Sequence, residues 1–487
     1  MPRAQFDFLD LPRQMPKELP VATRLGLDVE IYGKFEPAEA KAQAGRCLDC
    51  GNPYCASGCP VGNAIPQWLE LVRQGRLFEA ATLAHETNPL PEICGRVCPQ
   101  DRLCEGACTL ETGFDAVTIG SIEKYLVDEA FRQGWRPDLS RVKPRRERVA
   151  VIGAGPAGLA CADRLVRAGV AVTVFDRFDE IGGLLTFGIP PFKLEKSVIA
   201  TRREVLEGMG VRFALGIDVG RDIEFGKLMA EHDAVFVGTG ATTPVDARLP
   251  GQHLPGVLPA LPFLTANARR VLGRSLDASD AAMLDLKGKT VRVLGGGDTA
   301  MDCVRTARRL GASVVSCVYR RDEAAMPGSR REVKNARDEG VEFLFHRAPL
   351  SIEGDGRVER LRVARTEAAG RGAFALVEGE SETLDADVVI LAFGYRASPP
   401  AWLGEHGVAL ADSGLIAGGL ATAAQASTTG DRPWIAHSPY QTSLPKLWAG
   451  GDALRGADLV VTAVRDGRDA AAAMLKAFKG IAIRTAA

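Results

Sequence analysis

The sequence predicts an α/β protein with two nested, doubly wound (Rossmann-like) dinucleotide-binding domains and an α-helical, cysteine-rich N-terminal domain. The α/β part follows from a plan that occurs twice, at 149–176 and 290–321: a buried strand, a Gly-rich turn, a helix and a second buried strand. The separate N-terminal domain follows from the cysteines, because eight of the 11 lie before residue 110. A chain of 487 residues is long enough for three or four domains.

Composition and charge exclude several classes of function. Lys plus Arg number 60 and Asp plus Glu 61, so no net field favours nucleic acid or an anionic membrane as partner. The first 20 residues lack the apolar stretch of a signal peptide, and no run of about 18 apolar residues follows. We therefore expect a soluble cytoplasmic protein, and in that reducing compartment clustered thiols are more often metal ligands than disulfides.

The N-terminal domain, residues 1–145, is expected to be helical. Apolar residues recur at helical spacing in the stretch 67–85, which reads as a helix-like segment. A basic stretch with one proline, 141–148, then indicates a linker to the next domain.

The cysteines of this domain form two runs, C-x2-C-x4-C-x3-C and C-x3-C-x5-C-x3-C: Cys47, Cys50, Cys55 and Cys59, then Cys94, Cys98, Cys104 and Cys108. Structural zinc usually takes two separated pairs of ligands, whereas a cubane presents four corners to one wrapping loop. The crowding, and a proline after one cysteine of each run, favour two 4Fe–4S clusters over a zinc-bound interaction module. Read locally, each run would hold one cluster, but in two-cluster ferredoxins the fourth cysteine serves the other cluster.

The first glycine fingerprint, Gly153, Gly155 and Gly158, follows a buried strand and opens a helix. The first glycine permits the tight turn, the second lets a diphosphate approach the backbone, and the third lets helix and strand pack closely. Asp176 ends the next strand, where an acid hydrogen-bonds ribose hydroxyls. Strand, helix and acid together favour a dinucleotide site over an ordinary glycine turn.

The second fingerprint, G-x-G-x-x-A, is formed by Gly295, Gly297 and Ala300 in "GGGDTA", and Asp298 and Thr299 within it are further candidate cofactor-binding residues. Here the following strand ends in arginines, Arg320 and Arg321, instead of an acid. A guanidinium binds a 2′-phosphate that an acid would repel, so this site is predicted to prefer NADPH. The alternative is a solvated arginine pair at a strand end. Two such folds in one chain suit a hydride donor, NADPH, that reduces a flavin.

The second unit is predicted to be inserted into the first. Two similar strand-like runs, 231–240 and 385–394, stand before and after it, and the segment 447–474 indicates a strand, a Gly-Asp turn and a long helix that close the first domain. We expect three domains: a helical cluster domain 1–145, an FAD domain formed by 146–264 and 382–487, and an NADPH domain 265–381.

These motifs resemble the small (beta) subunits of bacterial NADPH-dependent glutamate synthases. The resemblance covers nearly all of the chain and rests on the cysteine pattern, "VAVIGAGPAGLACA", "GGGDTAMDC", "VYRR" and "LWAGGDALRGADLVVTAVRDGRDAA". It implies that NADPH reduces FAD and that electrons cross 4Fe–4S clusters to FMN on a large alpha subunit. That subunit forms glutamate from glutamine and 2-oxoglutarate. A paralogous electron-input subunit with another acceptor is the alternative.

The resemblance also assigns roles to residues. It places Gly182, Gly183 and Leu184 near the flavin and Gly451 and Asp452 at a second FAD motif. It has Thr462 begin a final helix whose positive end faces the flavin's pyrimidine edge. It exchanges ligands between the cysteine runs: Cys47, Cys50, Cys55 and Cys108 for one cluster, and Cys59, Cys98 and Cys104 for the other, with Glu123 or Cys94 as the eighth ligand. No residue is expected to act as general acid or base.

Overall fold

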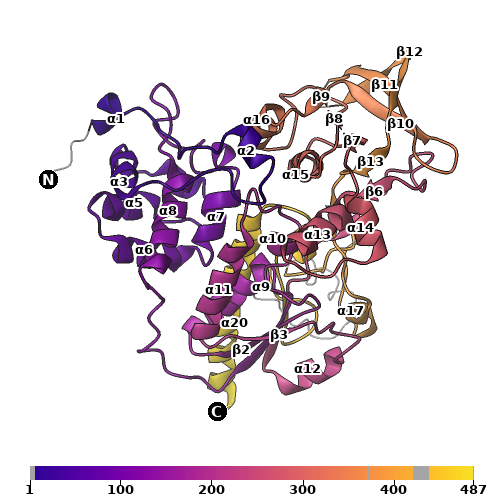
Figure 1. Ribbon diagram of the computed structural model, residues 1–487. Coiled ribbons are helices and arrows are strands. Elements are labelled where there is room, and N and C mark those ends of the chain that lie inside the picture. The colour runs from indigo at the N-terminus through magenta and orange to yellow at the C-terminus, as the bar shows by residue number, and fades with distance from the viewer. Residues whose placement is uncertain (1–5, 371–372, 420–437, 486–487) are drawn as a thin grey trace.

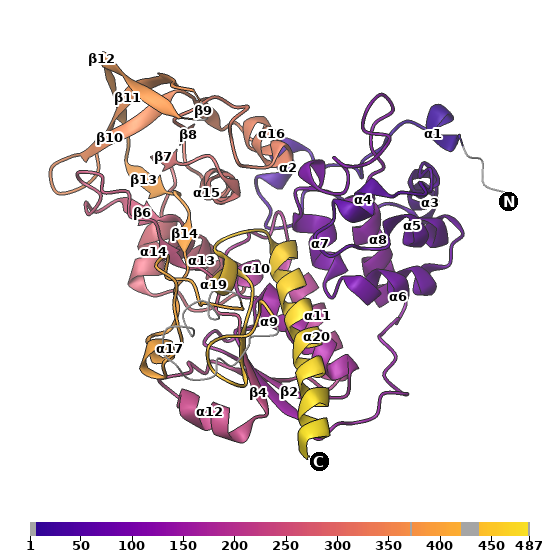
Figure 2. The same cartoon turned by 180° about the vertical axis from the view of Figure 1, so that it is seen from behind.

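The computed structural model describes residues 6–370, 373–419 and 438–485. Its elements form three parts, seen from opposite sides in Figures 1 and 2. The N-terminal helices lie to one side, the sheet that contains β1–β3 lies beside them, and the sheet that contains β7–β9 carries a separate antiparallel sheet at its far end. The predicted fold class is confirmed.

The N-terminal part is helical. The expected segment 67–85 is divided into two helices, because the chain turns at Gly75, which has φ +76°. The elements are α1 (Asp7–Asp10), α2 (Val21–Arg24), α3 (Pro37–Gly45), α4 (Tyr54–Ser57), α5 (Ile65–Arg73), α6 (Leu77–Thr87), α7 (Pro91–Val97), the 3₁₀ turn η1 (Gln100–Arg102) and α8 (Ile119–Arg132). From Gln133 to Glu147 the chain forms neither helix nor strand, as the predicted linker requires.

The first sheet is parallel and has the order β15-β4-β1-β2-β3. Its strands are β1 (Arg148–Ile152), β2 (Ala171–Asp176), β3 (Arg212–Leu215), β4 (Ala234–Val237) and β15 (Leu447–Ala449). Its helices are α9 (Pro156–Arg167), α10 (Leu184–Phe187), α11 (Lys196–Gly208), α12 (Phe225–Glu231), α17 (Ala401–Glu405), α19 (Asp452–Arg455) and α20 (Val460–Thr485). Figure 2 shows α20 running beside α9, against which it packs.

The second sheet is also parallel and has the order β6-β13-β7-β8-β9. Its strands are β6 (Val257–Pro259), β7 (Thr290–Leu294), β8 (Val314–Val318), β9 (Glu342–Leu344) and β13 (Val388–Leu391). Its helices are α13 (Ala260–Val271), α14 (Ala278–Leu284), α15 (Asp298–Arg309) and α16 (Arg330–Asp338). The first sheet resumes only at β15, so the second part is inserted in the first.

The predicted boundaries of the insertion are too narrow. β13 pairs with β7 in the second sheet just as β4 pairs with β1 in the first, so the two similar runs are equivalent strands of two related sheets. Both β6 and β13 fall outside the expected range 265–381. The chain crosses between the parts in a two-stranded ribbon of β5 (Thr243–Pro244) and β14 (Tyr395–Arg396).

An antiparallel sheet extends the second part. Its strands, in the order β10-β11-β12, are β10 (Arg347–Glu353), β11 (Arg360–Ala368) and β12 (Phe374–Asp385). A small apolar core lies between this sheet and the parallel sheet. The largest core is shared by the N-terminal helices and the first sheet, and it includes Trp68, Val149 and Val461. The helical part is therefore packed onto the first sheet through a common core.

Candidate functional site

A cavity of about 330 Å³ opens at the carboxyl ends of the first sheet. Residues that follow β1, β2 and β4 line it, among them Gly153, Asp176 and Gly238. The chain places β2 and β3 on one side of β1 and β4 on the other, so the strand order reverses at β1, and such switch points hold ligands in open α/β sheets. The volume falls within the usual range of ligand sites, roughly 300–1,000 Å³.

The first fingerprint forms one wall of this cavity. Gly153 has φ +104°, and a Cβ on Gly158 would lie 1.9 Å from the Gly153 carbonyl oxygen, so both must be glycine. A Cβ on Gly155 would meet nothing within 4 Å, and α9 begins at the next residue. Open space therefore faces the backbone at the N-terminus of α9, which is the environment a diphosphate requires.

Two acids line the cavity. The Asp176 carboxylate accepts hydrogen bonds from the backbone N–H of Ala154 at 2.7 Å and of Phe178 at 2.9 Å, and burial raises its pKa. A carboxylate has about four acceptor sites, so it retains capacity for ribose hydroxyls. Burial raises the pKa of Asp452 to about 7. Both side chains stand where the sequence predicts them.

The loop before α10 also reaches the cavity. Gly183, Leu184 and Gly451 line it, whereas Gly182 does not and donates its N–H to the Ala154 carbonyl. Of the residues expected near the flavin, Gly183, Leu184 and Gly451 therefore line the cavity and Gly182 does not.

Thr462 does not line the cavity. The final helix begins at Val460, and the Thr462 hydroxyl donates to the Leu459 carbonyl at 2.7 Å within the first turn. Leu459, Val460 and Ala463 line the cavity instead. The helix end thus faces the expected space, but through neighbouring residues, because the threonine hydroxyl closes its own turn.

Sequence reasoning missed Thr239. Its Oγ1 is buried and has no hydrogen-bond partner among the described residues, and the residue lines the cavity. An unpaired buried hydroxyl is unfavourable by about 1–3 kcal/mol, so it fits a polar ligand group. The signal was the stretch Gly238–Gly240 directly after β4, a glycine turn at the same edge as the fingerprint.

The second fingerprint follows β7 and opens α15 at Asp298. A Cβ on Gly297 would have a single neighbour, Pro327 Cγ at 4.0 Å, so its backbone is also approachable. Asp298 Oδ1 accepts the Ser329 N–H at 3.0 Å, which folds the loop after β8 back toward the helix N-terminus. Gly295 and Ala300 hold the turn and the helix packing, and Thr299 stands in the first turn of α15.

Arg320 and Arg321 lie just after β8, as predicted. The Arg320 side chain is exposed, and its guanidinium carbon lies 4.8 Å from the centre of the Phe374 ring on β12. Arg321 Nη2 donates to the Tyr319 hydroxyl at 2.8 Å. Two guanidinium groups therefore stand at the strand end where a 2′-phosphate is expected.

The eight N-terminal cysteines surround two small cavities rather than two separate loops. Cys47, Cys50, Cys55 and Cys108 line the first, and Cys59, Cys94, Cys98, Cys104 and Glu123 line the second. Cys108 of the second run lies with the first run, and Cys59 of the first run lies with the second. The cavities thus group the cysteines as in the exchanged ligand sets and not as one cavity for each run. All 11 cysteines lie in the described residues, and none of them forms a disulfide there.

The donor sets suit clusters better than single ions. In the described part of the chain, no three or more His, Cys, Asp or Glu side chains form a group that would hold one metal ion. Each cavity instead spreads its thiols around a central space, as a cubane requires. Burial raises the pKa of Cys55 to about 12 and that of Cys59 to about 11, so these thiols ionise at neutral pH only when metal binding compensates.

The two candidates for the eighth cluster ligand, Cys94 and Glu123, both line the second cavity. Glu123 Oε1 accepts hydrogen bonds from the side-chain amides of Asn63 at 3.1 Å and Asn88 at 3.3 Å, and burial raises its pKa to about 8. The Cys94 thiol lies 3.7 Å from the Asn88 amide oxygen. Both side chains reach the cavity wall.

The three cavities adjoin one another in a row. Ile119 lines both cysteine cavities. Val461, in the first turn of α20, lines the second cysteine cavity, while its neighbour Val460 lines the large cavity of the first sheet. The second cysteine cavity therefore lies between the first cysteine cavity and the large one.

Comparisons with known proteins agree with this arrangement. Residues 26–135 match the family described as dihydropyrimidine dehydrogenase domain II, 4Fe-4S cluster. Residues 147–467 match the family described as pyridine nucleotide-disulphide oxidoreductase. The glutamate synthase [NADPH] small chain of Escherichia coli is 53% identical over 473 residues, which cover 96% of this chain and 97% of that one. This chain belongs to the glutamate synthase small-chain family.

As a member of the glutamate synthase small-chain family, the chain is an NADPH-dependent oxidoreductase whose cofactors are FAD, NADPH and 4Fe–4S clusters. The putative oxidoreductase UacF of E. coli is 50% identical over 486 residues, 96% of this chain and 74% of that one. Mycobacterium tuberculosis FprA in complex with NADPH has the same fold, with a TM-score of 0.55 and 21% identity over 70% of this chain and 86% of that one. Among the described residues, no helix is both long and apolar enough to span a membrane.

Proposed function

We propose that the chain is the electron-input subunit of an NADPH-dependent glutamate synthase. It oxidises NADPH at FAD and passes electrons through two 4Fe–4S clusters to the FMN of a large alpha subunit. That subunit forms glutamate from glutamine and 2-oxoglutarate. The observation that carries the proposal is the row of three adjoining cavities, combined with full-length similarity to a small chain of this name.

We assign FAD to the large cavity. Gly153, Gly155 and the N-terminus of α9 would hold its diphosphate, and Asp176 its ribose. Gly183, Leu184, Thr239, Gly451 and Asp452 would contact the remainder of FAD. NADPH would bind at Gly295, Gly297 and the N-terminus of α15, with its 2′-phosphate toward Arg320 and Arg321. A flavin accepts a hydride and releases the two electrons singly, which suits one-electron carriers.

We assign one cluster to each cysteine cavity, with the exchanged ligands. Ile119 would then lie between the two clusters, and Val461 between the second cluster and the FAD cavity that its neighbour Val460 lines. The eighth ligand is Cys94 or Glu123. Iron and acid-labile sulfide in the Cys94→Ser and Glu123→Ala variants decide between them, because only loss of a true ligand lowers the content of the second cluster.

Co-expression with an FMN-containing glutamate synthase alpha subunit tests the function. The complex is expected to form glutamate from glutamine and 2-oxoglutarate with NADPH as reductant, and the small chain alone is not. If the two chains co-purify with full cofactors yet NADPH does not support glutamate formation, the proposal fails.

A second candidate is supported by the likeness to UacF. In that case the same NADPH, FAD and cluster path would serve another acceptor. Normal reduction of the flavin and clusters by NADPH, together with failure to bind any glutamate synthase alpha subunit, would favour this reading.

A further inference from the structure

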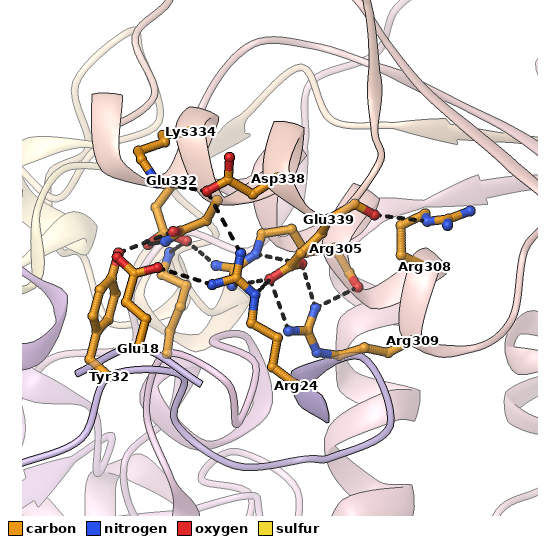
Figure 3. A network of polar contacts seen from close by, with 12 residues as sticks. Glu18, Arg24, Tyr32, Arg305, Arg308, Arg309, Glu332, Lys334, Asp338 and Glu339 are labelled. Atoms are coloured by element: carbon orange, nitrogen blue, oxygen red, sulfur yellow. Dashed lines mark hydrogen bonds and ion pairs between the residues drawn. The ribbon is translucent and has the colours of Figure 1, made fainter. Parts of the chain in front are cut away.

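A buried network of charges, shown in Figure 3, lies between the N-terminal part and the NADPH part. It joins residues 18–32, here called the N-terminal strap, to α15 and α16 of the NADPH part. Arg24, at the end of α2, is 1% exposed. Its guanidinium lies 3.2 Å from Glu339 Oε1, 3.3 Å from Glu18 Oε2 and 3.9 Å from Asp338 Oδ2. A strap residue thus inserts a charge into the NADPH part.

Within the NADPH part, two arginines and two glutamates of this network pair with one another without the strap. Arg305 forms ion pairs with Glu332 at 2.6 Å and with Glu339 at 2.8 Å, and Arg309 pairs with Glu339 at 2.7 Å. Two arginines therefore face two glutamates, all nearly buried. Removal of Arg24 leaves these pairs intact, so the loss falls on the connection between the parts and not on the NADPH part itself.

The FAD part enters the same junction through the loop before α11. The Phe192 ring contacts two guanidinium groups, whose central carbons lie 4.2 Å (Arg305) and 4.1 Å (Arg309) from the ring centre. Lys193 Nζ pairs with Asp302 Oδ1 at 2.9 Å. The strap contacts this loop as well, because the Ile31 N–H donates to the Phe192 carbonyl at 3.3 Å.

The other end of the strap is anchored in the cluster part. Glu30 pairs with Arg96 at 2.7 Å and with Lys124 at 2.5 Å. In the sequence, Arg96 stands between Cys94 and Cys98, which line the second cysteine cavity. Tyr32 donates its hydroxyl to Asn335 Oδ1 on α16 at 3.0 Å. The strap therefore connects the wall of a cluster cavity to the helices that pack behind the NADPH fingerprint.

Covalent connection alone leaves the angle between the FAD and NADPH parts free to change. The chain crosses between them in the short ribbon of β5 and β14, whose two strands have two residues each. Hydride transfer requires the reacting carbons to lie about 3–3.5 Å apart with aligned orbitals. Contacts outside the ribbon must therefore set the orientation of the two parts.

We propose that the N-terminal strap holds the NADPH part in the orientation that brings the nicotinamide to the flavin, and that Arg24 is a positioning residue for hydride transfer. Arg24 contacts neither the FAD cavity nor the NADPH fingerprint. Its loss should slow flavin reduction and leave nucleotide affinity unchanged, which a residue of the binding site would not do.

The test is anaerobic stopped-flow reduction of the flavin by NADPH in the Arg24→Ala holoprotein. We expect the limiting rate to fall on the order of 10- to 100-fold, since misplacement by about 1 Å can have this effect. The dissociation constant for NADP⁺ and the contents of FAD, iron and sulfide should stay at wild-type values. Arg24→Lys should recover part of the rate, and Arg76→Ala, which removes an exposed arginine of the same part, should have none of these effects.

Tyr32→Phe provides a second variant that removes one hydrogen bond to α16 without changing any charge. It should lower the limiting rate by a smaller factor in the same direction, and it decides the matter if Arg24→Ala does not fold. Wild-type rates in the folded variants would overturn the proposal. So would a loss of rate that matches the loss of bound FAD, because that result indicates a purely structural role.

Discussion

Arg320→Ala should change which nicotinamide cofactor the protein prefers. The Arg320 guanidinium is exposed at the end of β8, where a 2′-phosphate is expected, and stacks on Phe374. A hydrogen bond to a charged group contributes about 1.5–3 kcal/mol, or roughly 10- to 150-fold in affinity. Because Arg320 is exposed to water, the effect should lie near the lower limit, about tenfold.

The assay is kcat/KM for NADPH and for NADH with an artificial electron acceptor. We expect the value for NADPH to fall about tenfold and that for NADH, which has no 2′-phosphate, to stay unchanged. Arg365→Ala is the matched control, because this exposed arginine lies on the antiparallel sheet that also contains Phe374 and pairs there with Glu380. Equal losses for both cofactors would refute the assignment, and so would an unchanged preference.

Three further predictions concern a glycine of the cavity wall and two buried cationic side chains. Gly155→Ala should lower FAD content without unfolding the protein, as measured by flavin absorbance and circular dichroism, because its Cβ would point into the cavity and not into the chain. Burial lowers the pKa of Lys196 to about 7. Between pH 7 and about 10.5 the folded state therefore carries a neutral Lys196 while the unfolded chain still carries the charge, so the free energy of unfolding rises with pH. Relative to Lys196→Met, urea unfolding should show a rise of up to about 1.4 kcal/mol per pH unit in that window. Arg202→Ala should destabilise the protein by about 3–5 kcal/mol in the same assay, since it leaves Glu92 buried and unpaired, and Arg202→Met with Glu92→Leu should restore most of the loss.

Local sequence signals predicted the parts of the site that depend on backbone geometry. A strand, a glycine turn and a helix have the same physical requirements wherever they occur, so both fingerprints were found from their spacing. The acid Asp176 was found because it ends the strand that follows the first fingerprint, and Arg320 and Arg321 because they come just after the strand that follows the second.

Features that depend on tertiary packing were not predictable. Cysteine spacing alone left the local and exchanged ligand sets open, because whether Cys59 and Cys108 change places depends on how the two runs fold against each other. The boundaries of the insertion failed because β4 and β13 have the same apolar pattern yet lie in different sheets. The charge of Arg24 gave no indication of its partner Glu339, more than 300 residues away.

The most direct test of the central claim is an anaerobic titration of the purified chain with NADPH, after iron, acid-labile sulfide, FAD and zinc have been assayed. Two 4Fe–4S clusters predict about eight iron and eight sulfide per FAD. NADPH should then reduce the flavin and generate the electron paramagnetic resonance signal of a reduced cluster. FAD accompanied by zinc and no sulfide would contradict the account, as would intact clusters that stay oxidised while NADPH reduces the flavin.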